Sequence, residues 1–600
     1  MNFSNDGKIP EGIIFSDLGN LCKPACNISD RRVIDKWESV PYETAVISGT
    51  MLSAFQTASP APVTLSPELK GWYRIYVSLM DNPEDNRVFL RLTGDSAQSK
   101  LRPGGYNYHK VWWKWEDFEE CFWKCADMTG QSVEIARRTG EGLLGCQIAW
   151  FRFVPMSDEE VEEYKQDAKR SDTKRIFATH DMFSLSVTEA PETFEEWKLL
   201  FESMKHTDVE ILSLDERIIP DGYRSSADEP DHAFYSDLRK ALYFHSLKKT
   251  KQLFADLIKT GRENGIKMYL SKRMGVSLGG AFPYDDEDVN AKFVTDNTHL
   301  RCKDRDGTWI DSLSLAYPEV QEHVISSFEN MAELGCDGVT LIYIRGIPFV
   351  LFEEPVIERF NKKYPGVNCC ELPLSDERVR SIHCELMNEF MCRLKNALDE
   401  KCKSIGRAPL KIHAYVGSSL DDNRLYGIDV ETWAKEGIID SFSAYPLRIT
   451  ERLDGVFRDD NPELIDLEKY TRKTREKYAK TIHRDVEYEP GHIELEFVEE
   501  YVNMAKKYGI KAYFELLPRL KTVESYEEDA LLMLERGAEN FSLWDCDFRS
   551  ETKSQWNAAS RLGHLDDIKN GKLDKYPTTM YRILSINGKN ISLYNPTWIG

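Results

Sequence analysis

The first quarter of the chain alternates apolar and polar residues with a period of two. Runs such as 72–77 (Trp-Tyr-Arg-Ile-Tyr-Val) and 88–92 place every second side chain on one face, as half-buried strands do. Runs at 133–135 and 148–153 continue the pattern, Gly, Pro, Asn and Asp separate the runs, and no long helical period intervenes. We therefore expect a β-sandwich of jelly-roll type over residues 1–156.

The pattern changes after residue 156. Ser157 and Glu160 have the spacing of a capping box, which predicts a charged linker helix over 157–174. Short apolar runs then alternate with longer segments of helical period. The predicted strands are 176–181, 209–215, 267–273, 338–345, 411–416, 439–445, 511–517 and 540–545. Alternating strands and helices of this kind predict a (β/α)8 barrel, a TIM barrel, over 175–576.

The tail returns to strand periodicity on either side of Asn587-Gly588, a dipeptide that favours a tight hairpin turn. We expect a C-terminal β-hairpin over 577–600. The fold class is thus multidomain, with a sandwich, a linker helix, a barrel and a hairpin.

Composition excludes several functions. The 600 residues carry 78 Lys and Arg against 100 Asp and Glu, a net charge of −22, so nucleic acid and anionic membranes are not expected partners. No signal sequence or long apolar segment is evident, and we expect a cytoplasmic protein unless a leader was removed. The 13 cysteines include no CxxC pair, so free thiols are expected, with no metal and no cofactor. The oligomeric state stays open, a homodimer included.

In a parallel barrel, side chains at the carboxyl ends of the strands build the active site. Counting alternate positions to each strand end predicts a mouth rich in aromatic and charged groups. The residues are His180, Asp215, Arg273, Tyr343, Arg345, His413, Tyr415, Tyr445, Glu515, Trp544 and Asp545. Aromatic faces with carboxylates and Arg suit a polyhydroxylated ring, so the expected partner is a carbohydrate substrate.

Glycoside hydrolysis needs a carboxylic acid and a second carboxylate. Glu515 is the first choice as nucleophile or base, although an Arg-paired structural role, with Arg345 or Arg519, also fits it. Glu353 is the expected acid because the apolar run 349–352 precedes it, and an apolar surround raises a carboxyl pKa. Glu354 is expected to bind substrate, although both residues also suit the first turn of a helix. Asp215 is a further catalytic candidate.

Residues 337–346 (Asp-Gly-Val-Thr-Leu-Ile-Tyr-Ile-Arg-Gly), followed by the acid-rich loop 349–355, resemble bacterial proteins labelled family-ten-like glycosyl hydrolases. Those proteins place a β-sandwich before a (β/α)8 barrel, and the resemblance implies carbohydrate processing. Well-understood barrel glycosidases end strand four with Asn-Glu, whereas this chain has Tyr343-Ile344-Arg345 there. Glu515 matches their nucleophile position, and their acid position is not filled.

Two other functions remain open. A polysaccharide or uronate lyase would use Tyr or His as base, with Arg345 neutralising the uronate. A non-catalytic carbohydrate-binding protein would keep the mouth and have lost its acid.

Overall fold

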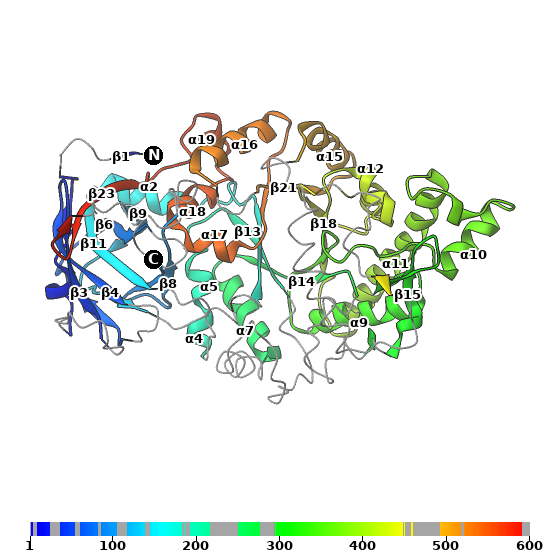
Figure 1. Cartoon of the computed structure of the whole chain (residues 1–600), viewed down its shortest axis with the longest axis horizontal. Helices are drawn as coiled ribbons and strands as arrows, with labels where there is room; N and C mark the ends of the chain where they lie inside the picture. Colours follow the sequence, from blue (N-terminus) through cyan, green and yellow to red (C-terminus); the bar gives the residue numbers. More distant parts are fainter. Residues whose placement is uncertain are drawn as a thin grey trace.

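The computed structural model (Figure 1) describes residues 2–3, 9–24, 36–54, 60–81, 86–104, 117–137, 145–182, 185, 193–215, 250–276, 293–294, 296–447, 449, 458–459, 493–517 and 521–590. Two parts lie along the long axis of the molecule, β-sheets from the N-terminal third and a barrel from the rest. Within the described residues no helix has the length and apolar character needed to cross a membrane.

Eight parallel strands form a closed barrel, as the sequence predicts. They are β12 (Ile176–His180), β13 (Val209–Asp215), β14 (Lys267–Arg273), β17 (Gly338–Ile342), β18 (Lys411–Val416), β19 (Ser441–Ala444), β21 (Lys511–Glu515) and β22 (Phe541–Leu543). Strands two, three and five have the predicted bounds, and the others are one to three residues shorter at one or both ends.

Helices cover the barrel and bury a continuous apolar core against its outer face. The longer ones are α7 (Thr250–Glu263), α9 (Pro318–Glu333), α10 (Glu354–Lys363), α11 (Glu377–Ser404), α15 (Leu495–Tyr508) and α16 (Val523–Glu535). Shorter ones are α4 (Phe194–Trp197), α5 (Leu199–Glu202), α12 (Leu420–Asn423), α13 (Val430–Lys435), α17 (Cys546–Glu551), α18 (Lys553–Ala559) and α19 (Leu565–Lys569), with 3₁₀ turns at 298–300, 369–371 and 424–426. A small antiparallel sheet joins β15 (Arg301–Lys303), β16 (Trp309–Leu313) and β20 (Arg458–Asp459).

The N-terminal part consists of two sheets that pack through a shared apolar core. The larger contains β1 (Asn2–Phe3), β2 (Ile13–Phe15), β3 (Glu38–Thr44), β4 (Ser48–Ala54), β6 (Trp72–Met80), β9 (Asp117–Asp127) and β11 (Cys146–Pro155). The smaller contains β5 (Val63–Leu65), β7 (Val88–Leu92), β8 (Ser99–Leu101) and β10 (Val133–Ala136), and α1 (Leu18–Leu21) lies beside β3 and β4. All strand pairs except β1–β23 are antiparallel. The jelly-roll connectivity stays a prediction.

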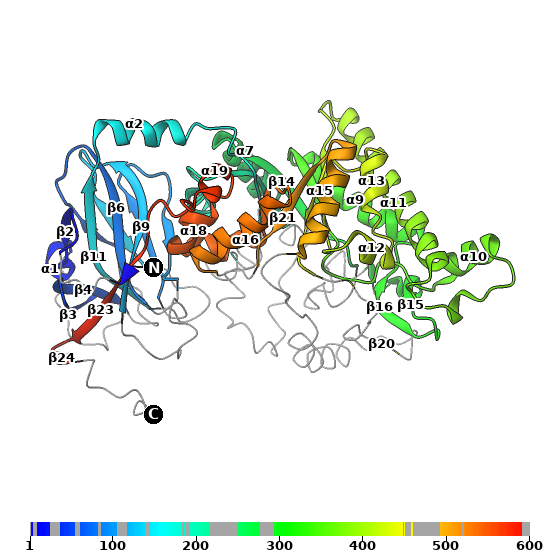
Figure 2. The ribbon, with the colours of Figure 1, turned by 90° about the horizontal axis from the view of Figure 1, so that it is seen from above.

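The linker and the tail tie the two parts together. Helix α2 (Asp158–Asp167) begins with the predicted capping box, in which the Ser157 hydroxyl accepts from the Glu160 amide and the Glu160 carboxylate accepts from the Ser157 amide. At the other end of the chain, β23 (Thr579–Ile586) and β24 (Lys589–Asn590) form a hairpin. Its turn residues Asn587 and Gly588 both have positive φ, as a type I′ turn requires. Strand β23 pairs with β3 and β9 of the larger sheet (Figure 2).

Candidate active site at the barrel mouth

The lumen of the barrel is layered by alternate strand residues. Near its middle, the Ser213 and Thr340 hydroxyls lie 2.8 Å apart. His413 stacks on Phe177 with ring centroids 3.8 Å apart, and its two ring nitrogens lie 2.8 and 3.0 Å from the hydroxyls of Ser441 and Ser443. Burial lowers the pKa of His413 well below its usual range, so the ring is neutral. His413 is thus part of the lumen packing, below the strand ends where substrate contact was predicted.

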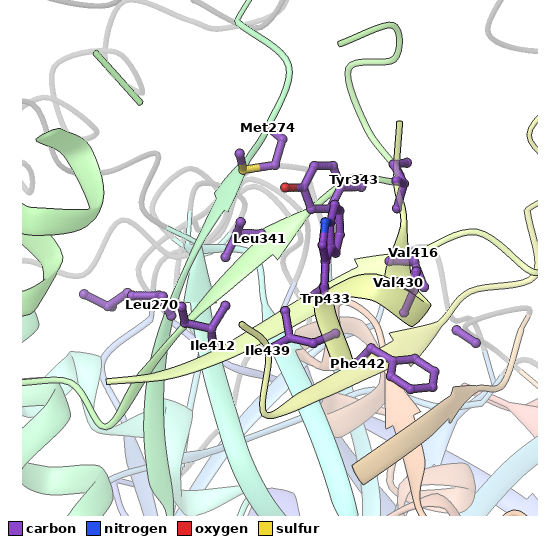
Figure 3. Close-up of a cluster of buried hydrophobic side chains, with 14 of the residues drawn as sticks. Leu270, Met274, Leu341, Tyr343, Ile412, Val416, Val430, Trp433, Ile439 and Phe442 are labelled. Atoms are coloured by element: carbon purple, nitrogen blue, oxygen red, sulfur yellow. The ribbon is translucent and has the colours of Figure 1, made fainter. Parts of the chain in front are cut away.

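Strand four turns its residues the other way from the predicted register. Tyr343 lies on the outer side of the barrel, where its hydroxyl is 3.0 Å from Met391 Sδ and its ring is 5.2 Å from that of Trp433 (Figure 3). Thr340, Ile342 and Ile344 face the lumen instead. Both faces of 338–344 are largely apolar, so the sequence pattern could not distinguish them. Tyr343 is therefore removed from the predicted substrate-binding set.

Aromatic side chains gather where β18, β19 and β22 end. The ring centroids of Tyr415 and Trp544 lie 5.1 Å apart, and those of Tyr445 and Trp544 lie 6.1 Å apart, both edge to face. The guanidinium carbon of Arg345 lies 5.6 Å from each of the Tyr445 and Trp544 ring centroids. Arg345 reaches this position from the loop after β17, beside Gly346, whose φ of 79° only Gly adopts readily. The structure thus brings four of the predicted mouth residues together.

Glu515 lies directly against this aromatic group and is closed off from solvent. Its carboxylate accepts hydrogen bonds from the Trp544 backbone amide at 2.8 Å, from the Tyr415 hydroxyl at 3.0 Å and from Arg549 Nη2 at 2.8 Å. Burial raises the pKa of Glu515 to about 7, although the charge of Arg549 and these donors oppose that rise. Because every contact is a donor, the geometry suits the ionised carboxylate.

Asp215, at the end of β13, is the other acidic residue that follows the lumen-facing alternation of its strand to the mouth. Its Oδ2 atom lies 3.9 Å from Arg273 Nε, at the end of the neighbouring β14. Asp545 follows Trp544 and belongs to the opposite alternation. Its φ of 48° is unusual for a residue other than Gly, and its amide donates to Thr179 Oγ1 at 2.8 Å.

Glu353 and Glu354 lie in a separate set of contacts. Glu353 precedes α10 and is fully buried, where its carboxylate accepts from the Ser314 hydroxyl and from the backbone amides of Leu351 at 3.1 Å and Lys303 at 3.3 Å. Burial raises the pKa of Glu353 to about 7, as predicted for a general acid. Among the described residues, Glu353 and Glu515 share no hydrogen-bond partner. Glu354 is exposed and pairs with Lys303, so neither contact reaches the aromatic group.

His180, the last residue of β12, belongs to the outward alternation of that strand. It is buried, and burial, followed by the charge of Lys100 from β8, lowers its pKa to about 3. His180 therefore faces the N-terminal sheets and is neutral. Within the described ranges, no group of three or more His, Cys, Asp or Glu side chains is arranged to hold a metal ion.

Sequence reasoning missed the partner of Glu515. Arg549 comes from α17, after the last strand, and its Nη1 atom also donates to the Tyr526 hydroxyl of α16 at 3.0 Å. An Arg partner for Glu515 was considered, but as Arg345 or Arg519. Arg345 lies over the aromatic rings instead, and Arg519 lies outside the described residues. No periodicity marks Arg549, because α17 is a short helix in an acid-rich segment.

Comparisons with known proteins assign no family. No family model matches the sequence, and no curated protein matches it. Among solved structures, the glycoside hydrolase domain of PgaB (BpsB) from Bordetella bronchiseptica is similar at 11% identity and a TM-score of 0.36, over 64% of this chain and 98% of that one. The glycoside hydrolase domain of PelA from Pseudomonas aeruginosa is similar at 9% identity and a TM-score of 0.28, over 62% and 95%.

A Podospora anserina GH26-CBM35 β-(1,4)-mannanase is similar over 92% of this chain and 94% of that one, at 10% identity and a TM-score of 0.25. Likenesses of this degree identify neither a family nor an activity. None of the three carries the family-ten-like label, so that resemblance stays a prediction. The function of this chain must be inferred from its own site.

Proposed function

We propose that the protein is a glycoside hydrolase whose substrate binds at the carboxyl end of the barrel. The observation that carries this proposal is the position of Glu515, a buried carboxylate at the base of an aromatic group formed by Tyr415, Tyr445 and Trp544. Aromatic faces pack on the apolar faces of sugar rings, while Arg345 and the carboxylates offer hydrogen bonds to hydroxyl groups.

In this proposal Glu515 acts in its ionised form, either as nucleophile on the sugar or as base for the attacking water. Three donors to its carboxylate, from Arg549, Tyr415 and Trp544, support that form. A second carboxyl group must protonate the leaving oxygen. We assign that role to Asp215, because it follows the lumen-facing alternation to the same end of the barrel. Glu353 is the comparison, since its contacts are confined to 303–353.

A carbohydrate-binding protein without turnover is the second candidate. The observation that favours it is the buried pair between Glu515 and Arg549, which satisfies the carboxylate without a substrate. In that case Glu515 would serve to orient Trp544 and Tyr415 for binding.

The test is a turnover screen on oligosaccharides, uronate-containing polysaccharides and aryl glycosides. Wild type is compared with Glu515→Gln, Asp215→Asn and Glu353→Gln, and Glu358→Gln, an exposed acid of α10, is the matched control. The proposal expects cleavage with uptake of water by wild type and the control, and a loss of at least about a thousandfold in the first two variants. Binding of a glycan without turnover of any would establish the second candidate. Unsaturated products from uronate substrates would indicate a lyase.

A further inference from the structure

A cavity of about 390 Å³ lies between the N-terminal sheets and the barrel, away from the mouth. Strands β6 and β9, helices α2, α5 and α18, and the residues that precede β12 and β13 supply its walls. Figures 1 and 2 show α18 beside β9, between the sheets and the barrel, and α2 lying along the sheets. A cavity of this size is within the range of small-molecule sites, which often form between domains.

Lys553, the first residue of α18, is the unusual side chain of this cavity. It is only 8% exposed, and among the described residues its ammonium group has no hydrogen-bond acceptor. The closest carboxylate in its electrostatic surroundings, that of Glu202, already accepts from Lys124 Nζ at 3.2 Å and Lys205 Nζ at 2.6 Å. A buried ammonium without an acceptor is costly, so a fold retains it where a ligand supplies the missing anion.

The charges around the cavity also favour an anion. Six Lys or Arg side chains line it against five Asp or Glu, whereas the whole chain has 78 against 100. Burial, followed by the charges of Lys205, Lys124 and Lys174, lowers the pKa of His206. His564 is a further cation, because its two Asp partners outweigh burial and raise its pKa to about 9. Cations thus gather here in a protein that is acidic overall.

The remaining wall is aromatic. Phe122 and Tyr576 stack with centroids 3.8 Å apart, and the Tyr164 ring lies 5.1 Å from that of His206. All four side chains line the cavity. His206 also has a φ of 58°, in the left-handed region that residues other than Gly rarely adopt, and such strained residues cluster at functional sites. Flat rings beside a buried cation form a site for a flat molecule that carries a negative charge.

We propose that this cavity is a second ligand site, independent of the barrel mouth, which binds a small organic anion with a flat ring and pairs its acidic group with the Lys553 ammonium. The ring packs against Tyr164, Phe122 and Tyr576. The cavity contacts the sheets, the linker helix and the barrel together, so ligand binding also stabilises their arrangement.

The test uses phenyl phosphate and benzoate as probes, with benzyl alcohol as the uncharged match for benzoate and inorganic phosphate as the anion without a ring. Calorimetric titration of the full chain at pH 7 is expected to show binding of both ring anions, and at least tenfold weaker binding of the other two. Lys553→Met keeps the length of the side chain and removes the charge. It is expected to weaken phenyl phosphate binding at least tenfold while the melting temperature stays the same or rises. Lys569→Met, at an exposed lysine of α19, is expected to bind as wild type does.

A measurement on the unaltered protein stands beside the variants. Trinitrobenzenesulfonate, itself a flat ring with a negative charge, is expected to modify Lys553, as shown by peptide mass spectrometry, and phenyl phosphate is expected to protect it. The proposal is overturned if neither ring anion binds at millimolar concentration, if Lys553→Met binds as tightly as wild type, or if benzyl alcohol or inorganic phosphate binds as tightly as the ring anions. Modification of Lys553 that phenyl phosphate does not slow would also overturn it.

Discussion

Arg549 Nη2 lies 2.8 Å from Glu515 Oε1, and neither side chain is more than 1% exposed. Removing one partner of such a pair leaves an uncompensated buried charge, which costs about 3–5 kcal/mol. Arg549→Met is therefore expected to lower stability by that amount, measured as the shift of the urea or thermal midpoint. The double variant Arg549→Met with Glu515→Gln is expected to recover much of the loss, and equal losses in the single and double variants would contradict the pairing.

The Tyr415 hydroxyl sets the pH range in which Glu515 is ionised. The pKa of Glu515 is raised to about 7, and the hydrogen bond from Tyr415 opposes that rise. If Glu515 acts ionised, kcat/KM falls as the pH drops through about 7. Tyr415→Phe is expected to move this acidic limb upward by up to about one pH unit.

The control for Tyr415 is Tyr513→Phe, which changes the same atom in the same lumen. The Tyr513 hydroxyl donates to Glu210 Oε2 at 2.9 Å, among the residues near the beginning of the strands. Its loss is expected to leave the acidic limb in place. An unchanged limb in Tyr415→Phe as well would remove Glu515 as the titrating group.

His564 links stability to pH. Burial would lower its pKa, but hydrogen bonds to Asp167 of the linker helix and Asp208 before β13 outweigh burial and raise the pKa to about 9. The unfolded chain has a His pKa of about 6.5, so this stabilisation is full below about pH 6.5 and is lost as the pH rises towards 9. A shift of this size corresponds to about 3 kcal/mol.

His564→Gln is therefore expected to reduce stability most below pH 6.5 and least above pH 9. Denaturation midpoints of wild type and variant at a series of pH values measure this difference. A difference between the two proteins that stays constant across that range would contradict a charged His564.

Tyr343 and Trp544 separate the two sides of the barrel wall. Tyr343 contacts Met391 and Trp433 on the helix side, whereas Trp544 contacts Tyr415 and Tyr445 at the mouth. Tyr343→Phe is expected to reduce stability by about 1 kcal/mol and to leave glycan affinity unchanged. Trp544→Ala is expected to weaken glycan binding at least tenfold in calorimetric titration. A loss of affinity in Tyr343→Phe would restore the predicted register of strand four.

Hydrophobic period was enough to predict the barrel and most of its lumen. Strands such as 411–416 and 511–515 alternate clearly between polar inward and apolar outward positions, so Tyr415, Glu515 and their neighbours were placed correctly. Strand four was not, because Ile342 and Ile344 are as apolar as the residues expected to cover it. Register in such a strand depends on which neighbours fill the space, and no local pattern records that.

Long-range pairing was the other limit. Arg549 is 34 residues beyond Glu515, and Glu353 is held by Ser314 from the segment before α9. The cavity around Lys553 needs residues from the sheets, the linker and the barrel at once. Sequence alone places each of these residues on an element, whereas the partners follow only from the packing of those elements.

The most direct test of the central claim is kcat and KM for wild type and Glu515→Gln on the best glycoside from the screen. Circular dichroism on the same samples checks that both are folded. The account predicts a fall in kcat of at least about a thousandfold with KM within a few-fold of wild type, because the variant keeps the aromatic wall and lacks the reacting carboxylate. A folded Glu515→Gln variant with kcat within tenfold of wild type would contradict it.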